Sequence, residues 1–325
     1  MIHSVFHAIG VFFNHLAAVE WKWLAIGILC HLCKLVAVSR AWQNIIQAAY
    51  PDRPVRWRQM FGSYVAGTGV NALIPARGGD VVRLFLAKRR IEGSTYTTLV
   101  STSLLQTLFD MLVATCFIVW AVTQHVLPGL DALRSPSLPA LDYSWAFRHP
   151  VAGLILFGLL LLFGTALVAW IAERVEEFRV KVAQGFAAFR DRSYYLRRVV
   201  FWQLVDWTLR LVTVFFFLRA FGIPATLRNA LLVQVSQSLA TIFPVSPAGI
   251  GTEQALLLYI FRNVTSKSMA LSFSVGMRVT LIIVNAVVGF TAILLMTGTL
   301  RIRRAAESDR TGGEPAQADG SDGRR

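Results

Sequence analysis

Two arginines and an aspartate surround a break in an apolar segment: Arg77, Asp80 and Arg83. A helix that begins at such a break points unpaired N–H groups, with about half a positive charge, at whatever lies beside it. Guanidinium groups bind phosphate through paired hydrogen bonds. The stretch therefore predicts a binding site for a phosphate-bearing ligand. Three residues suited to breaking a helix interrupt the segment: Pro75, Gly78 and Gly79.

A second stretch repeats the pattern, because an apolar segment stops at prolines, turns through glycines and resumes at Glu253. Backbone groups left unpaired in hydrocarbon cost several kcal/mol unless they are buried in protein or line a wet cavity. Interrupted helices at corresponding places in two halves of a chain point to a binding site near the bilayer midplane. Two breaks therefore predict a cavity. The second break consists of Pro244, Pro247, Gly249 and Gly251.

Further charged residues lie inside or at the start of apolar segments. Asp206 and Arg210 are four residues apart and so share a helix face, and Arg278 begins the last apolar segment. A charged residue within a membrane span is a functional candidate by default. The predicted substrate-binding set is Asn71, Arg77, Asp80, Arg83, Asp206, Arg210, Glu253 and Arg278.

Structural roles compete with these functional ones. Asp206 and Arg210 would also be explained as a pair that neutralises itself within a helix bundle. Asp80 and Glu253 occupy helix starts, where a carboxylate either stabilises the dipole or carries a proton. Asn71 and Gln106 suit interhelical hydrogen bonds. If Asp80 pairs with Arg77 or Arg83, and Glu253 with Arg278, the pocket keeps a net positive charge.

The composition defines the class of protein. The chain has 325 residues, of which 55% are hydrophobic and 15% charged, and its mean hydropathy is +0.55. These values indicate a membrane protein. The formal net charge of +14 does not indicate nucleic-acid binding, since Lys and Arg gather in short loops as they do on the cytoplasmic side of membranes. Cys30 and Cys33 lie in an apolar run without a second cysteine pair, so we expect no metal or other cofactor.

The expected fold is an all-α polytopic membrane protein with about five full spans plus two broken, re-entrant helical hairpins that form an inverted-repeat-like core. The spans are expected near residues 19–38, 97–122, 151–171, 199–221 and 279–300, and the hairpins near residues 61–90 and 229–262. Strongly basic flanks place both ends of the first hairpin in the cytoplasm. The second hairpin would enter from outside, although residues 229–262 could instead cross fully.

The remaining segments complete the expected organisation. Residues 1–18 are predicted to form an interfacial helix, residues 19–300 the transmembrane domain, and residues 301–325 a disordered cytoplasmic tail. Residues 40–58 are expected to be a basic cytoplasmic loop, and residues 172–198 a mixed-charge helix on the membrane surface. This arrangement puts the N-terminus outside, the C-terminus in the cytoplasm and the protein in the cytoplasmic (inner) membrane.

At its two breaks the chain resembles the lysylphosphatidylglycerol synthase transmembrane, flippase-like family. The first break, with a proline followed by R-x-G-acid-x-x-R, and the second, a proline and glycine turn ending in G-x-x-E, look like the two family signatures. The signature residues are Asn71, Pro75, Arg77, Gly79, Asp80, Arg83, Pro244, Ser246, Pro247, Gly249, Gly251 and Glu253. In two departures, Asp80 stands where Glu is more usual and Ala248 where a second Gly is usual.

The resemblance implies a stand-alone member that binds or translocates membrane lipids, without the aminoacyltransferase domain. We expect a lipid flippase or transporter rather than an enzyme, acting on an anionic lipid or a polyprenyl phosphate in a midplane cavity. The alternative is an accessory subunit that presents lipid to a separate glycosyl- or aminoacyl-transferase. The chain contains no P-loop, so any energy would come from ion gradients or downhill flow.

Overall fold

The computed structural model describes residues 19–74, 78–124, 176–242 and 251–311, and these ranges contain helices and turns but no strand. Four helical runs in them are long and apolar enough to cross a membrane: Trp21–Ala49, Tyr96–Thr123, Arg192–Ala220 and Lys267–Gly298. The chain is therefore an all-α polytopic membrane protein, as predicted. The expected interfacial helix (1–18) and the expected third span (151–171) lie outside the described residues.

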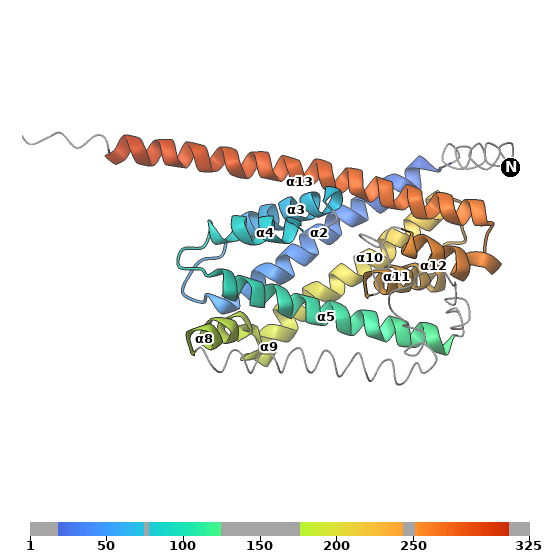
Figure 1. Cartoon of the computed structure of the whole chain (residues 1–325), viewed down its shortest axis with the longest axis horizontal. Coiled ribbons are helices and arrows are strands. Elements are labelled where there is room, and N and C mark those ends of the chain that lie inside the picture. The colour runs from blue at the N-terminus through green and yellow to red at the C-terminus, as the bar shows by residue number, and fades with distance from the viewer. Residues whose placement is uncertain (1–18, 75–77, 125–175, 243–250, 312–325) are drawn as a thin grey trace, which may run out of the picture.

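The spans are helix α2 (Trp21–Ala49), helix α5 (Tyr96–Thr123), a run that ends in α10 (Phe201–Ala220), and most of α13 (Lys267–Thr311). The run into α10 begins with α9 (Arg192–Tyr194) and η3 (Tyr195–Val200). The first hairpin lies between α2 and α5, which run in opposite directions, and the second lies between α10 and α13, which also run in opposite directions (Figure 1). Side chains on α5 and α13 are largely exposed, which suits contact with lipid.

Both broken segments form helical hairpins. The first consists of α3 (Trp57–Leu73) and α4 (Gly78–Lys88), and the second of α11 (Leu227–Ile242) and α12 (Thr252–Ile260), with the short η5 (Phe261–Asn263) after it. The two helices of each hairpin pack against each other. The hairpins occupy opposite ends of the molecule, and their broken ends approach its middle (Figure 1).

Glycines set the closest helix contacts. A Cβ on Gly27 of α2 would lie 2.7 Å from the ring of Phe217 on α10, and these two helices form the most extensive pairing in the described structure. A Cβ on Gly69 of α3 would lie 2.6 Å from the Cα of Gly289 on α13. Because side chains of ordinary size cannot fit at these crossings, the backbones meet directly. α3 is thereby held between α13 and α4.

The first span is longer than expected, since α2 continues to Ala49 and the following loop covers only residues 50–56. The prediction that Arg40 lies in a loop is wrong, because Arg40 lies inside α2. Its guanidinium stacks on Trp57, 4.3 Å from the ring centroid. Polar residues of the extension bind the loop backbone: Gln43 Nε2 donates to the carbonyl of Val55 at 3.1 Å. A hydropathy pattern locates only the part of a helix that lies in hydrocarbon, so it does not predict the polar extension of α2 beyond the membrane.

The last helix also exceeds its predicted bounds. α13 begins at Lys267 rather than near residue 279 and continues to Thr311, so residues 301–311 are helical rather than disordered. Residues 312–325 lie outside the described structure. In the mixed-charge segment, α8 (Glu176–Gly185) and η2 (Ala187–Phe189) precede α9. α8 packs on the start of α5, where Thr98 Oγ1 donates to the carbonyl of Lys181 at 3.0 Å.

Candidate functional site

The first break is closed by a side chain from the helix that precedes it. α3 ends at Leu73 and α4 begins at Gly78, so the new helix starts with unpaired N–H groups. Asn71 Oδ1 accepts a hydrogen bond from the N–H of Gly79 at 2.8 Å, and its Nδ2 lies 3.4 Å from Asp80 Oδ1. Asn71 is therefore a cap for α4. Pro75 and Arg77 lie outside the described residues.

Close packing fixes where α4 points. A Cβ on Gly67 of α3 would lie 2.6 Å from the carbonyl oxygen of Gly79 and 2.8 Å from the Cβ of Arg83. A Cβ on Gly79 would in turn collide with the Gly67 carbonyl. The two helices can approach this closely only because both positions are glycine. This approach holds Arg83 against the bundle, one turn beyond the start of α4.

Arg83 is held by two aromatic rings and one hydroxyl. Its guanidinium carbon lies 4.4 Å from the ring centroid of Trp42 and 4.9 Å from that of Tyr64, and Nη2 donates to Ser103 Oγ at 2.6 Å. The Nε atom is buried without a hydrogen-bond partner. Among the described residues, no carboxylate oxygen lies within 4.0 Å of this guanidinium. Among the described residues, ring faces and a hydroxyl contact this guanidinium, and no carboxylate pairs with it.

A cavity of about 300 Å³ opens beside Arg83. Residues of α3, α4 and α5 line it, and Asp80, Gln106 and Asp110 contribute polar side chains to its wall. Apolar residues of the wall include Val100 and Leu104, which are 42% and 47% exposed and face outward from α5. The complete lining is Tyr64, Asp80, Arg83, Leu84, Val100, Ser103, Leu104, Gln106, Thr107 and Asp110.

Behind the cavity lies a second charged cluster formed by α5, α10 and α2. Arg210 Nε donates to Asp206 Oδ2 at 2.8 Å, and Arg210 Nη2 lies 3.6 Å from Asp110 Oδ1. Trp207 Nε1 donates to the same oxygen of Asp110 at 2.9 Å. Lys34 of α2 lies close enough to interact electrostatically with all three charged groups. Asp110 therefore belongs both to this cluster and to the cavity wall.

The second break has its own charged pair. Arg278 Nη1 donates to Glu253 Oε2 at 3.0 Å, and Gln237 Nε2 donates to Glu253 Oε1 at 3.2 Å. The ion pair expected between Glu253 and Arg278 is thus present, and it joins α12 to α13. Gly251, with φ +96°, precedes α12, and its N–H donates to Gln254 Oε1 at 2.7 Å. Pro244, Pro247 and Gly249 lie outside the described residues.

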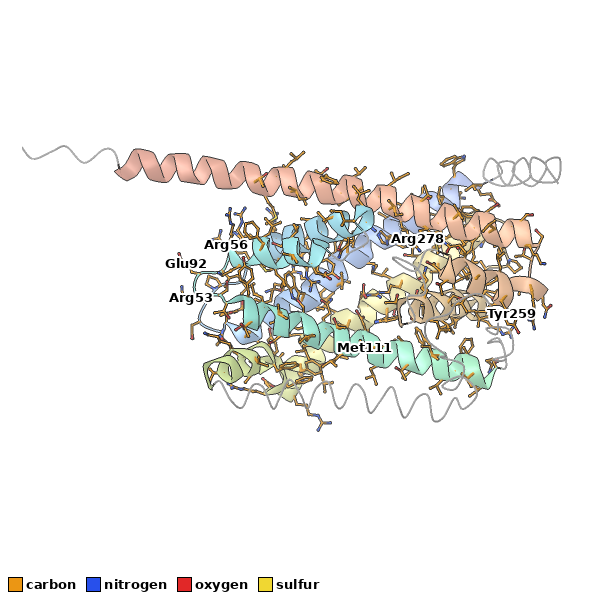
Figure 2. All side chains as sticks on the ribbon, in the orientation of Figure 1. Arg53, Arg56, Glu92, Met111, Tyr259 and Arg278 are labelled. Carbon is orange, nitrogen blue, oxygen red and sulfur yellow. The ribbon has the colours of Figure 1, made fainter. Side chains whose placement is uncertain are left out.

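The predicted site residues therefore fall into three groups. Asn71, Asp80 and Arg83 lie together at the first break, Asp206 and Arg210 form the pair behind the cavity, and Glu253 and Arg278 form a separate pair between α12 and α13 (Figure 2 labels Arg278 beside α13). The described structure does not place all of them around one cavity. Asp80 has no arginine within 4.0 Å among the described residues, so of its two expected partners Arg83 is excluded, and a pairing with Arg77 lies outside the described residues.

Sequence reasoning missed the partners of Arg83 and the place of Asp110. Trp42 and Tyr64 belong to other helices, and nothing in their spacing marks them as a cage for a guanidinium. For α5 a signal existed: Ser103, Gln106 and Asp110 recur at spacings of three and four residues in an otherwise apolar segment. That spacing places all three on one helix face.

The family model of the lysylphosphatidylglycerol synthase TM region matches residues 6–289. The chain belongs to this family. A UPF0104 membrane protein of Methanocaldococcus jannaschii is 24% identical over 197 residues, which cover 59% of this chain and 79% of the relative. No solved structure matches the chain.

Membership of the lysylphosphatidylglycerol synthase TM-region family suggests a role related to membrane lipids. The matched region covers both hairpins and the cavity. Within the described residues, no group of three or more His, Cys, Asp or Glu side chains is arranged to hold a metal ion.

Proposed function

We propose that this family member is a lipid transporter of the flippase type, which binds the phosphate of an anionic lipid or a polyprenyl phosphate in the cavity between α3, α4 and α5. The proposal depends on how the charge of Arg83 is balanced. Arg210 and Arg278 are each paired with a carboxylate at 2.8 and 3.0 Å, whereas Arg83 lines the cavity with no carboxylate of the described residues within 4.0 Å. A partly buried cation of this kind favours an anionic guest.

The start of α4 supports the same assignment. Asp80 lies in the first turn of α4 and contributes to the cavity wall, so the positive end of this helix faces the space beside Arg83. The apolar rim formed by Val100 and Leu104 suits acyl chains that extend from a bound headgroup into the bilayer. Two hairpins that approach from opposite ends would give such a ligand a route toward either side (Figure 1).

The proposal includes the location and orientation of the protein. Exposed basic residues, among them Arg53 and Arg56, gather at the end of the molecule where the first hairpin opens (Figure 2). Cytoplasmic loops are enriched in such residues. This end would face the cytoplasm, the start of α2 would face outward, and the protein would act in the cytoplasmic membrane without a metal or organic cofactor.

Native mass spectrometry of purified protein with lipid identification tests the binding step. We expect wild type to carry a selected phosphate-bearing lipid and Arg83→Gln to lose at least about tenfold of it, since hydrogen bonds to a charged group contribute about 1.5–3 kcal/mol. Arg40→Gln is the matched control, because Arg40 also stacks on a tryptophan but does not line the cavity. The same unselective lipid in all three proteins would refute the proposal.

Transport itself needs a second experiment. Purified protein in liposomes should move a fluorescent phospholipid between leaflets, and Arg83→Gln should slow this movement while Arg40→Gln does not. If the lipid binds but does not move, the protein would instead serve as an accessory subunit that presents lipid to a separate transferase. A chemically altered lipid after incubation would indicate an enzyme.

A further inference from the structure

We propose that Asp110 is a proton-binding site of the cavity, and that an anionic headgroup bound at Arg83 brings a proton onto this carboxylate. The inference rests on the proposed function, because it assumes that the cavity takes a phosphate. It adds a second ligand, a proton, and names the residue that receives it. A transporter built in this way would couple lipid binding to the proton concentration.

The geometry places Asp110 where it must respond to an anion. Asp110 and Arg83 line the same cavity of about 300 Å³ from opposite helices, α5 and α4. The Asp110 side chain is 33% exposed, so it reaches the open space. Arg83 reaches α5 at Ser103, and Asp110 lies two turns further along that helix, so a phosphate held by Arg83 would share the cavity with the Asp110 carboxylate and the two would repel each other. Protonation of Asp110 removes this repulsion and creates a donor for a phosphate oxygen.

Two cations, Arg210 and Lys34, lie near Asp110, and both also interact with Asp206. Arg210 donates to Asp206 at 2.8 Å but lies 3.6 Å from Asp110, so its closest contact is with the other carboxylate. Asp206 is 1% exposed and its Oδ1 has no hydrogen-bond partner, which binds Arg210 more firmly to that side. Trp207 supplies a neutral N–H donor to Asp110 at 2.9 Å. Asp110 can therefore change its charge while the Arg210–Asp206 pair stays intact.

Among the described residues, four helices besides α5 bring charged or titratable groups near Asp110. The charged or titratable groups that face Asp110 are Lys34 from α2, Tyr64 from α3, Asp80 and Arg83 from α4, and Asp206 and Arg210 from α10. α8 meets α5 at Thr98, about three turns away. The single charged residue of α11 is Arg228, near its first turn.

Asp80 is the competing carboxylate, and its position differs. It lies in the first turn of α4, where the helix dipole already favours a negative charge, and Asn71 Nδ2 approaches it at 3.4 Å. Asp110 lies in the middle of α5, far from either helix end. The proton comes from a hydronium ion or a buffer acid: its bond to that donor breaks, an O–H bond forms on a carboxylate oxygen of Asp110, and the conjugate base of the donor stays in solution.

The test measures proton uptake on binding. A short-chain phosphatidylglycerol is the probe, because its phosphodiester keeps one charge between about pH 5 and 9. Calorimetric titration in two buffers of different ionisation enthalpy gives the number of protons taken up per bound probe. For wild type we expect an uptake approaching one proton, and an affinity that falls up to about tenfold per pH unit as the pH rises. Asp110→Asn should show neither effect.

Three further variants make the result specific. Asp110→Glu should restore the uptake, which also answers the objection that Asp110→Asn misfolds. Asp80→Asn and the exposed Glu92→Gln should keep it. Uptake that survives Asp110→Asn, or that disappears in Asp80→Asn, overturns the inference. If wild type binds through Arg83 without proton uptake, only the inference fails, whereas the absence of any Arg83-dependent binding refutes the proposed function and the inference together.

Discussion

The side-chain oxygen of Asn71 accepts a hydrogen bond from the backbone N–H of Gly79 at 2.8 Å, so the last turn of α3 caps the first turn of α4. The two residues belong to opposite arms of one hairpin. The bond satisfies an N–H group that the break leaves without an intrahelical partner. It also sets the position of Arg83, which follows one turn later on α4. Asn71 thus acts on the cavity through the backbone.

Asn71→Ala should lower the stability of the hairpin by about 1 kcal/mol, the usual effect of removing a helix cap. Without the Asn71 side chain, the N–H of Gly79 has no partner in a region with little water, and this increases the loss of stability. Thermal unfolding in detergent measures the change, with Thr291→Val as a control, since that hydroxyl is exposed and donates to its own helix. A melting temperature equal to wild type would mean that the Asn71 bond contributes nothing to stability.

The glycine contact between α3 and α4 predicts a larger loss of stability. Gly67→Ala and Gly79→Ala each place a methyl group against backbone that cannot move alone. Overpacking of this kind costs about 1–3 kcal/mol, and displacement of α4 should also weaken lipid binding at Arg83. Gly298→Ala is the matched control, because its Cβ would meet nothing within 4 Å. Equal stability and equal lipid content in all three variants would contradict the close packing.

The ion pair of Glu253 and Arg278 predicts non-additive substitutions. The two side chains are 11% and 23% exposed, so each single change to Gln should cost between the roughly 1 kcal/mol of an exposed pair and the roughly 3–5 kcal/mol of a buried one. The double variant should lose less than the sum, because it leaves no unmatched charge. A double-mutant cycle on denaturant unfolding measures the coupling, and strictly additive losses would show that the two charges do not interact.

A hydrogen bond between spans offers a smaller test. His31 Nε2 and Asn285 Oδ1 are 2.8 Å apart and join α2 to α13. Interhelical bonds of this kind contribute about 0.6 kcal/mol on average and seldom more than about 1.7. A cycle of His31→Ala and Asn285→Ala should therefore give a coupling in that range. The yield of cross-linking between α2 and α13 reports whether these helices stay packed. It should decrease only slightly in the two variants.

Much of the architecture follows from local sequence. The breaks of both hairpins are predicted from clusters of proline and glycine, because proline cannot continue a helix and glycine tolerates the turn that follows. Four of the five expected spans match helices in the described residues, since twenty apolar residues have few other stable environments. The helix ends were harder to place. α2 continues through Arg40 and Asn44 to Ala49 because Trp57 stacks on Arg40, and Asn44 Nδ2 donates to the carbonyl of Arg198 at 2.6 Å.

The candidate site, too, could be predicted in part from the sequence and depends in part on tertiary structure. The sequence by itself determined that Arg83, Arg210 and Arg278 lie in or beside membrane helices and that two breaks need a protected environment. Only the tertiary structure decided which of these arginines has no carboxylate partner among the described residues, because Asp110, Asp206 and Glu253 reach their partners through the crossing of helices or through a shared helix face. Charge compensation depends on distances of a few ångströms, and the packing of α2, α5 and α10 sets those distances across segments far apart in the chain.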